Sequence, residues 1–432
     1  MIIHPAKLIR GRLTMPGDKS ISHRAAMIAA LADGTSRLRN FSNSADCEAT
    51  LSCLTRLGVS IERDRDDLRV HGAGAEGLRV PAEPLDCSNS GTTMRLLAGI
   101  LAGQNFKSTL TGDASLRSRP MARIIEPLRM MDAGISSNDG RAPLIIAGHR
   151  PLKAINYDLP IASAQVKSCL LLAGLNADGR TEIIEHEVTR DHTERMLRWF
   201  GVPLETTDVE GSRAVAIGGP ARLSARDVSI PGDISSAAFF IAAAALLRGS
   251  SFEITDVGVN PTRATFLEQL RSFGFDVAVR DVREECHEAV GTVRVSGSKS
   301  SSESAAPLRG SLIPQLIDEL PLLAVVGSQI EGGIEIRDAA ELRAKESDRI
   351  AVTVQNLRAM GAEVEELKDG LRLTGPVRLR GATIDPRGDH RIAMAFSVAG
   401  LIAQGETEIK DAECVAVSFP EFFELLESVV ER

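Results

Sequence analysis

Six short polar clusters recur along the chain at intervals of roughly seventy residues, and each runs directly into an apolar stretch rich in alanine and leucine. Asp, Ser and Asn side chains accept hydrogen bonds from the first amides of a helix, so each cluster predicts a helix start. The stretches that follow are apolar nearly all round, which predicts buried helices. The six segments are GDKSISHRAAMIAAL from Gly17, NSGTTMRLLAGIL from Asn89, IASAQVKSCLLLAGL from Ile161, GDISSAAFFIAAAALL from Gly232, IDELPLLAVVG from Ile317 and GDHRIAMAFSVAGLIA from Gly388.

The capped end of such a helix is the end that can meet a ligand, because the rest of the helix is expected to be buried. Aligned peptide dipoles place about half a positive charge at a helix N-terminus. Several N-termini that converge would therefore form an anion site before any side chain is counted. The Lys and Arg residues near these polar turns indicate the same chemistry; they are Lys19, Arg24, Arg119, Arg190, Lys345, Arg349 and Arg391.

A second recurrent element lies between the clusters, namely an amphipathic helix, a glycine and an alternating strand. Glycine closes helices by adopting the left-handed conformation, and the alternation predicts a strand with one buried face. We expect six units, three in each of two domains, with the divide near residues 226–232. The opening strand, residues 2–15, could belong to either half. The glycines are Gly58, Gly134, Gly201, Gly274 and Gly361.

Composition narrows the class of protein. A chain of 432 residues with 43% hydrophobic and 25% charged residues indicates a globular protein of two domains. Its net charge of −8, its 3% aromatic content, and its single Trp and Tyr argue against a nucleic-acid partner and favour a small anionic ligand. The apolar runs are too short to cross a membrane, and no secretion leader opens the chain, so a cytoplasmic protein is expected. The six cysteines lack metal-ligand spacing and are expected to be reduced and mostly structural.

Six motifs resemble the 5-enolpyruvylshikimate-3-phosphate (EPSP) synthase family, in order and over essentially the whole chain. They are PGDKSISHRA at Pro16, NSGTTMRL at Asn89, GDASLRSRPM at Gly112, TRDHTERM at Thr189, AKESDRI at Ala344 and GDHRIAMAF at Gly388. The resemblance implies an α/β fold, a two-domain inside-out α/β barrel with six repeated units and buried helices. It implies domain I at residues 1–17 and 232–432, domain II at residues 18–231, and an active site in the cleft between them.

The resemblance also implies transfer of the carboxyvinyl group of phosphoenolpyruvate to the 5-hydroxyl of shikimate 3-phosphate, with release of phosphate and without a cofactor or metal. Arginine suits both anionic substrates, because its planar donors pair with carboxylate and phosphate oxygens. The implied phosphoenolpyruvate site is Lys19, Gly91, Arg119, Gln165, Arg349 and Arg391. The implied shikimate 3-phosphate site is Lys19, Ser20, Arg24, Ser163, Gln165, Thr189, Arg190, Asp318 and Lys345.

The reaction adds and then eliminates through a tetrahedral intermediate, so it needs a base for the hydroxyl and an acid for the methylene carbon. By resemblance Asp318 is the proton acceptor, and Lys19 and Glu346 deliver and retrieve the second proton. Two departures stand out. Ala164 occupies a position where better-known members carry a second serine, and Val417 stands where members often carry a lysine. These changes, together with His192, suggest a divergent branch of the family.

Purely structural interpretations remain open for two of these motifs. Asp318 and Glu319 could simply cap a helix, and residues 345–349 could form an ion-pair ladder on a helix surface. Among rival functions, the sister transferase acting on a UDP-sugar (UDP-N-acetylglucosamine enolpyruvyl transferase) usually carries a cysteine before its Arg-Pro pair, and residues 113–119 contain none. An RNA 3′-phosphate cyclase and a non-catalytic anion-binding protein are two more rival functions. A monomer is expected.

Overall fold

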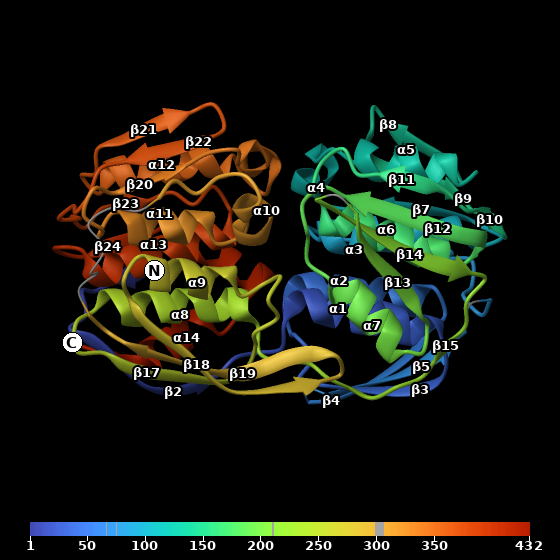
Figure 1. Ribbon diagram of the computed structural model, residues 1–432, viewed down its shortest axis with the longest axis horizontal. Coiled ribbons are helices and arrows are strands. Elements are labelled where there is room, and N and C mark those ends of the chain that lie inside the picture. The colour runs from blue at the N-terminus through green and yellow to red at the C-terminus, as the bar shows by residue number, and fades with distance from the viewer. Residues whose placement is uncertain (66, 75, 210, 299–305) are drawn as a thin grey trace. The chain divides into compact units, whose positions relative to one another are not determined.

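The computed structural model describes residues 1–432 except 66, 75, 210 and 299–305. The chain divides into two compact units, each with its own hydrophobic core. Unit 1 comprises Met1–Pro16, Pro231–Glu284 and Ala289–Arg432, and unit 2 comprises Gly17–Ile230 and Glu285–Glu288. Both units mix helices with sheets (Figure 1).

Unit 2 repeats one order of elements: a buried helix, a strand, an outer helix and a β-hairpin. The buried helices are α1 (Lys19–Leu31), α3 (Gly91–Ala102) and α6 (Ala164–Gly174), and the outer helices are α2 (Ala45–Arg56), α5 (Ala122–Met130) and α7 (His192–Trp199), with α4 (Ala114–Ser118) between. The strands are β3 (Ala32–Arg39), β4 (Ser60–Asp64), β5 (Asp67–Ala73), β6 (Leu85–Asp86), β7 (Lys107–Thr111), β8 (Gly134–Asn138), β9 (Arg141–Ala147), β10 (Leu152–Lys153), β11 (Asn156–Asp158), β12 (Ala177–Glu185), β13 (Leu204–Val209), β14 (Ser212–Gly219), β15 (Leu223–Ser224) and β16 (Val228–Ser229).

Unit 1 follows the same order. Its buried helices are α8 (Ile234–Leu246), α11 (Leu320–Gly327) and α13 (His390–Ile402), and its other helices are α9 (Thr265–Ser272), α10 (Leu312–Leu316), η1 (Ala340–Ala344), α12 (Arg349–Ala359), η2 (Ala412–Val417) and α14 (Phe422–Val429). Its strands are β1 (Ile2–Ile3), β2 (Leu8–Thr14), β17 (Ser251–Gly258), β18 (Asp276–Glu285), β19 (Glu288–Ser296), β20 (Ile334–Ile336), β21 (Val364–Leu367), β22 (Gly370–Leu373), β23 (Thr383–Ile384), β24 (Thr407–Ile409) and β25 (Val430–Glu431).

Each buried helix lies against its own sheet. In unit 2 the three sheets have the strand orders β15-β3-β5-β4, β6-β7-β9-β8 and β10-β12-β14-β13, and they are backed by α1, α3 and α6 respectively. In unit 1 the orders are β18-β19-β17-β2-β25, β20-β22-β21 and β1-β24-β23, backed by α8, α11 and α13. The described residues therefore form three helix-and-sheet repeats per unit.

The predicted opening strand is two strands. β1 pairs antiparallel with β24, while β2 pairs in parallel with β17, in a different sheet of unit 1. The last repeat has no hairpin after β24 in the described residues, and β1 occupies the place that a hairpin strand fills elsewhere. The start of the chain thus completes a repeat built mostly from its end.

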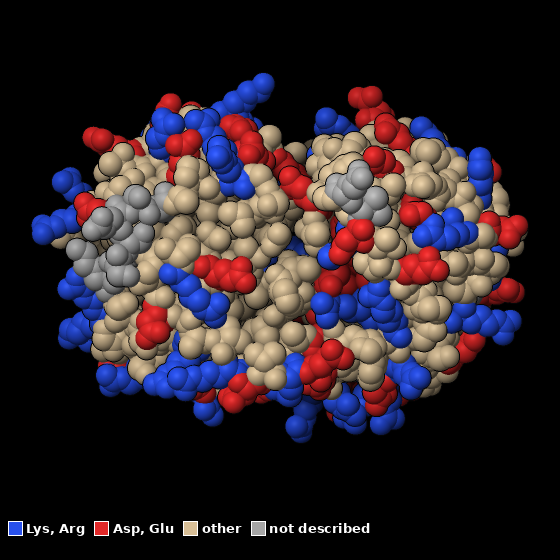
Figure 2. Space-filling view, in the orientation of Figure 1, with Lys and Arg blue, Asp and Glu red and all other residues tan. Residues whose placement is uncertain are grey.

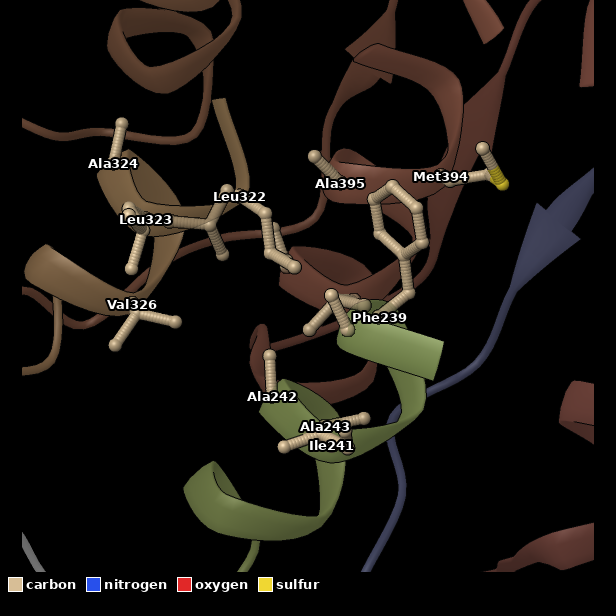
Figure 3. Packing of buried hydrophobic residues seen from close by; sticks show 14 of the residues in the cluster. Phe239, Ile241, Ala242, Ala243, Leu322, Leu323, Ala324, Val326, Met394 and Ala395 are labelled. Atoms are coloured by element: carbon tan, nitrogen blue, oxygen red, sulfur yellow. The ribbon is translucent and has the colours of Figure 1, made fainter. Parts of the chain in front are cut away.

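The cores consist of the helices that the sequence predicted to be buried. In α8 every residue from Ile234 to Ala245 is buried, and α11 is buried throughout. Side chains of α8, α11 and α13, among them Phe239, Leu322 and Ala395, point toward one another (Figure 3). This all-round burial leaves only the helix ends accessible. No helix in the described part of the chain is long and apolar enough to span a membrane.

Four of the five predicted helix-closing glycines have positive φ, and the prediction for Gly134 is wrong. Gly58, Gly201, Gly274 and Gly361 have φ between 82° and 91°. After α5 the equivalent position is Asp132, with φ 68°, and Gly134 begins β8 instead. Aspartate tolerates this conformation because its short polar side chain can form local hydrogen bonds.

Candidate functional site

The first turn of α1 carries predicted site residues of unit 2. Asp18 caps the helix by accepting a hydrogen bond from the Ile21 amide at 2.9 Å. Lys19 Nζ contacts Asp46 Oδ2 at 2.9 Å, at the start of α2, and both side chains are mostly buried. An ammonium group therefore lies beside a positively polarised helix end, where an anion would be favoured.

Arg24, one turn along α1, is buried and held by neutral oxygens. Its Nε donates to Thr193 Oγ1 at 2.7 Å and its Nη2 to Ser168 Oγ at 2.9 Å. Its Nη1 donates to the Ser20 carbonyl at 2.8 Å. Burial lowers the pKa of Arg24 to about 10, although the charge of Glu194 acts in the opposite direction. An anionic group on a ligand would offset the free-energy cost of burying this guanidinium.

The starts of α3 and α6 are joined by side chains. Gln165 Nε2 donates to Thr92 Oγ1 at 2.9 Å, and Arg95 Nη1 donates to Gln165 Oε1 at 2.5 Å. Ser163 caps α6 through the Val166 amide at 3.4 Å. A Cβ atom at Gly91 would lie 2.7 Å from Arg95 Nη1, so only glycine leaves this guanidinium in place.

Arg119 follows the short helix α4 and reaches the start of α3. Its Nη2 donates to Asn89 Oδ1 at 2.5 Å and to Ser115 Oγ at 3.2 Å. A Cβ atom at Gly91 would lie 3.5 Å from Arg119 Nη1. The structure therefore brings Gly91, Arg119 and Gln165 together at the paired starts of α3 and α6.

Thr189 and Arg190 lie between β12 and α7. The Thr189 amide and hydroxyl both donate to Glu185 Oε2, at 3.2 and 2.7 Å. The charge of Arg190 contributes to lowering the pKa of Arg24, which places the two guanidinium groups in one electrostatic neighbourhood.

In unit 1, the starts of all three buried helices meet around Arg391, in the first turn of α13. Arg391 Nη1 donates to Ser235 Oγ of α8 at 2.6 Å and to the Asp318 carbonyl, just before α11, at 3.2 Å. Its Nη2 lies 3.5 Å from Asp318 Oδ2. Asp389 caps α13 by accepting a hydrogen bond from the Arg391 amide at 3.0 Å.

Arg349, the first residue of α12, is 1% exposed and contacts three carboxylates. It lies 2.8 Å from Asp389 Oδ2, 2.6 Å from Glu346 Oε2 and 3.5 Å from Asp318 Oδ1. Burial alone would lower its pKa, but Asp389 and Glu346 outweigh burial and raise it. Asp318 therefore lies between Arg349 and Arg391.

The two purely structural interpretations, a helix cap at 318–319 and a surface ion-pair ladder at 345–349, are wrong. Glu319 occupies the N-cap of α11 without forming a side-chain cap. Lys345 follows η1, where it pairs with Glu341 at 3.0 Å, and Arg349 is buried at the start of a different helix. Residues 345–349 therefore do not form a helix-surface ladder. Lys345 lies on this segment with Glu346, and its described ion pair is with Glu341 rather than with the Arg349 cluster.

Arg263 and Glu319 are cluster members that sequence reasoning missed. Both are 3% exposed, and Arg263 Nη1 lies 3.1 Å from Glu319 Oε1. Ser235 Oγ also donates to Glu319, which in turn lies 3.7 Å from Arg391. The signal available for Glu319 was its place directly before a wholly apolar helix, where an uncompensated charge would be costly.

Among the described residues, no group of three or more His, Cys, Asp or Glu side chains could hold a metal ion. All six cysteines are free thiols, and burial raises the pKa of Cys47, beside Lys19, to about 12. Surface Lys and Arg are interspersed with Asp and Glu on the face that Figure 2 shows. The cations buried at helix starts, such as Arg24, Arg349 and Arg391, differ from these surface charges in being withdrawn from solvent.

Together these features define a class: a two-unit α/β protein whose buried helices gather cations, amides and carboxylates at their N-terminal ends. The family model for EPSP synthase (3-phosphoshikimate 1-carboxyvinyltransferase) matches residues 3–426. The chain is 51% identical over 431 residues to a 3-phosphoshikimate 1-carboxyvinyltransferase of Koribacter versatilis, covering 100% of this chain and 99% of that protein. It is 49% identical to the one of Salinibacter ruber, covering 99% and 98%.

Solved structures agree with the sequence relatives. An EPSP synthase structure from Acinetobacter baumannii superposes with a TM-score of 0.86 at 42% identity, covering 99% of this chain and 97% of that chain. The chain belongs to the EPSP synthase family and has its two-domain fold, which confirms the predicted family and fold class.

Proposed function

We propose that the residue sets of units 1 and 2 form a single active site for phosphoenolpyruvate and shikimate 3-phosphate. As a member of the EPSP synthase family, the chain is a transferase that moves the carboxyvinyl group of phosphoenolpyruvate to shikimate 3-phosphate, in aromatic amino acid biosynthesis. One observation carries the proposal of residue roles: in each unit the starts of the buried helices gather around arginines that are themselves buried. Buried cations at helix ends favour small, highly charged ligands.

The proposed phosphoenolpyruvate site draws on both units. Each member lies at or reaches the start of a helix and supplies a cation, an amide or, at glycine, free space. The members are Lys19, Gly91, Arg119, Gln165, Arg349 and Arg391. Arg119 and Gln165 are held beside Gly91 in unit 2, whereas Arg349 and Arg391 flank Asp318 in unit 1. Guanidinium groups on both units could pair with the carboxylate and the phosphate of this substrate.

The proposed shikimate 3-phosphate site lies chiefly on unit 2. Arg24 and Arg190 supply neighbouring cations, and the starts of α1 and α6 supply amides. The full proposed set is Lys19, Ser20, Arg24, Ser163, Gln165, Thr189, Arg190, Asp318 and Lys345.

For proton transfer we assign Asp318 as the acceptor for the attacking hydroxyl. Its two carboxylate oxygens each lie 3.5 Å from a guanidinium nitrogen of Arg349 or Arg391, so it is oriented and stays available as a base. Lys19 and Glu346 are assigned to the methylene carbon. Fixed cations and helix ends then stabilise the charge that develops in the tetrahedral intermediate.

The test is phosphate release with each substrate alone and with both together. Release that requires both substrates, in the wild type and in an exposed-site control such as Asp208→Asn, supports the assignment. Release from phosphoenolpyruvate alone, or with a UDP-sugar in place of shikimate 3-phosphate, contradicts it. Arg24→Ala and Arg119→Ala should each raise the KM of the substrate assigned to that residue far more than the KM of the other.

We further propose that units 1 and 2 are the functional domains, that they close on the substrates, and that the chain acts as a cytoplasmic monomer. The assignment of cations from both units to one small substrate motivates this proposal of closure. Small-angle scattering with both ligands should show a smaller radius of gyration than without them. Identical curves contradict closure, and a mass of twice the chain contradicts the monomer.

A further inference from the structure

Lys167, on α6, is the one charged residue of a helix whose second half, from Cys169 onward, is apolar, and it is fully buried. Its Nζ lies 3.0 Å from Glu185 Oε2 and 2.7 Å from Glu194 Oε1, and none of the three side chains is more than 4% exposed. Burial alone would lower the pKa of Lys167, but Glu194 and Glu185 outweigh burial and raise it. Lys167 is therefore a buried cation between two carboxylates.

Such a triad is weak evidence of stabilisation, because the desolvation of three charges offsets their attraction. A packed apolar group would fill the same space at similar or lower free energy. The presence of this triad is better explained by its contacts with the residues around Arg24 and Thr189.

Both carboxylates connect Lys167 to the proposed phosphate site. Glu185 Oε2 accepts both hydrogen bonds of Thr189, and so fixes the segment that carries Arg190. Glu194 exerts the largest charge effect on Arg24, ahead of Asp18 and Glu288, whose charges act in the same direction.

Neighbours of the triad also touch Arg24 directly. Ser168, next to Lys167, and Thr193, next to Glu194, both accept from Arg24, and their hydroxyls lie 2.6 Å apart. The triad is thus next in sequence to the two hydroxyls that hold the Arg24 guanidinium, and the charge of Glu194 acts on that guanidinium. An uncompensated carboxylate there would compete with a ligand phosphate.

We propose that Lys167 is a positioning residue for shikimate 3-phosphate: it holds Glu185 on the Thr189 segment and keeps Glu194 from competing with the ligand phosphate for Arg24. Lys167 touches neither the substrate nor the reacting atoms. It acts through Arg24 and Arg190. The inference rests on the proposed function, because it requires the phosphate of shikimate 3-phosphate to bind at Arg24.

The test compares the KM values of the two substrates in Lys167→Met, with the exposed Lys107→Met as the matched control. Lys167→Met should raise the KM for shikimate 3-phosphate at least tenfold and leave that for phosphoenolpyruvate within twofold. Adding Glu194→Gln to Lys167→Met should restore the first KM to within threefold of wild type. If Lys167 only filled space, Glu194→Gln would not rescue the KM of the double variant, because glutamine and glutamate have the same shape and differ only in charge.

Two results would overturn the inference: equal rises in both KM values, or a double variant no better than Lys167→Met. If Lys167→Met does not fold, as judged by circular dichroism, Glu194→Gln alone decides. Lys167 is shared between two carboxylates, so the triad keeps one net negative charge in the wild type. Glu194→Gln keeps the Lys167–Glu185 pair and removes that charge, so it should lower the KM for shikimate 3-phosphate twofold to fivefold. An unchanged or higher KM refutes the proposal. A wild type that does not turn over shikimate 3-phosphate refutes the proposed function instead.

Discussion

Arg24 of unit 2 and Arg349 of unit 1 are held in opposite ways. In unit 2, Arg24 donates all its described hydrogen bonds to neutral oxygens. In unit 1, Arg349 is surrounded by three carboxylates and Arg391 lies between Asp318 and Glu319. Burial lowers the pKa of Arg24, whereas Asp389 and Glu346 outweigh burial and raise that of Arg349.

This difference indicates that the two arginines have different roles, one in binding and one in proton transfer. A cation with neutral partners keeps its charge for a ligand, which suits the binding of a phosphate dianion. A cation among carboxylates orients those carboxylates, which suits proton transfer. We therefore expect substitution of Asp318 in unit 1 to affect mainly turnover, and substitution of Arg24 in unit 2 to affect mainly the capture of shikimate 3-phosphate.

The largest expected effect is on turnover, at Asp318. Asp318→Asn keeps the shape but removes the base, so kcat should fall about 100-fold to 10,000-fold, the usual contribution of a general base. Binding of shikimate 3-phosphate, measured by calorimetry, should stay within a few-fold of wild type. Asp208→Asn, at an exposed ion pair of unit 2, is the control and should leave kcat unchanged. A variant that loses binding and keeps kcat would reverse the proposed division.

Arg391→Ala should weaken phosphoenolpyruvate capture by about 2 to 5 kcal/mol, because it leaves a desolvated anion without its partner. The same substitution also removes a cation beside Asp318, so kcat should fall together with the rise in KM. The exposed Arg372→Ala is the matched control in unit 1. Steady-state kinetics with phosphoenolpyruvate varied would contradict the assignment if KM stayed at the wild-type value.

The sequence predicts the helices well, because their signals are local. Polar caps before apolar runs mark five of the six buried helices, where Asp18, Ser90, Ser163, Asp233 and Asp389 form the predicted caps. At α11 the N-cap residue, Glu319, forms no side-chain cap, and its carboxylate contacts Arg263 and Ser235 instead. Gly134 illustrates the limit of such signals, since spacing alone does not tell which of two nearby residues adopts the left-handed conformation.

The residues around the site are harder to predict, because their partners are distant in sequence. Arg263 meets Glu319 only through the packing of repeats, and nothing local indicates that pair. Lys167 is different: a lysine in an apolar helix predicts a buried ion pair, since lysine is almost never fully buried unpaired. The identity of its partners, Glu185 and Glu194, still needed the fold.

A third prediction concerns the stability of unit 2. Burial, together with the charges of Lys19 and Arg24, lowers the pKa of His23 well below its usual value. The unfolded chain then binds a proton below pH 6.5 that the folded unit does not, so stability is lost as pH falls. At pH 5 the loss is about 2 kcal/mol.

Urea denaturation of His23→Gln and wild type at pH 7.5 and pH 5 measures this term. The wild type should lose more stability between the two pH values than the variant does. His186→Gln, at an exposed ion pair of the same unit, is the control and should behave as wild type. Equal losses in wild type and His23→Gln would show that burial and the cations of unit 2 do not lower the pKa of His23 in the folded state.

The smallest expected effect tests whether neutral oxygens in unit 2 add to phosphate capture. Ala164 is the half-buried first residue of α6, where better-known members of the family carry a serine. Ala164→Ser adds one hydroxyl donor at the proposed phosphate site and should tighten shikimate 3-phosphate binding by about 0.5 to 1.5 kcal/mol. Ala122→Ser, at the half-buried first residue of α5, is the control. Calorimetry showing equal affinities for wild type and Ala164→Ser would mean that binding in unit 2 depends on its cations and helix ends alone.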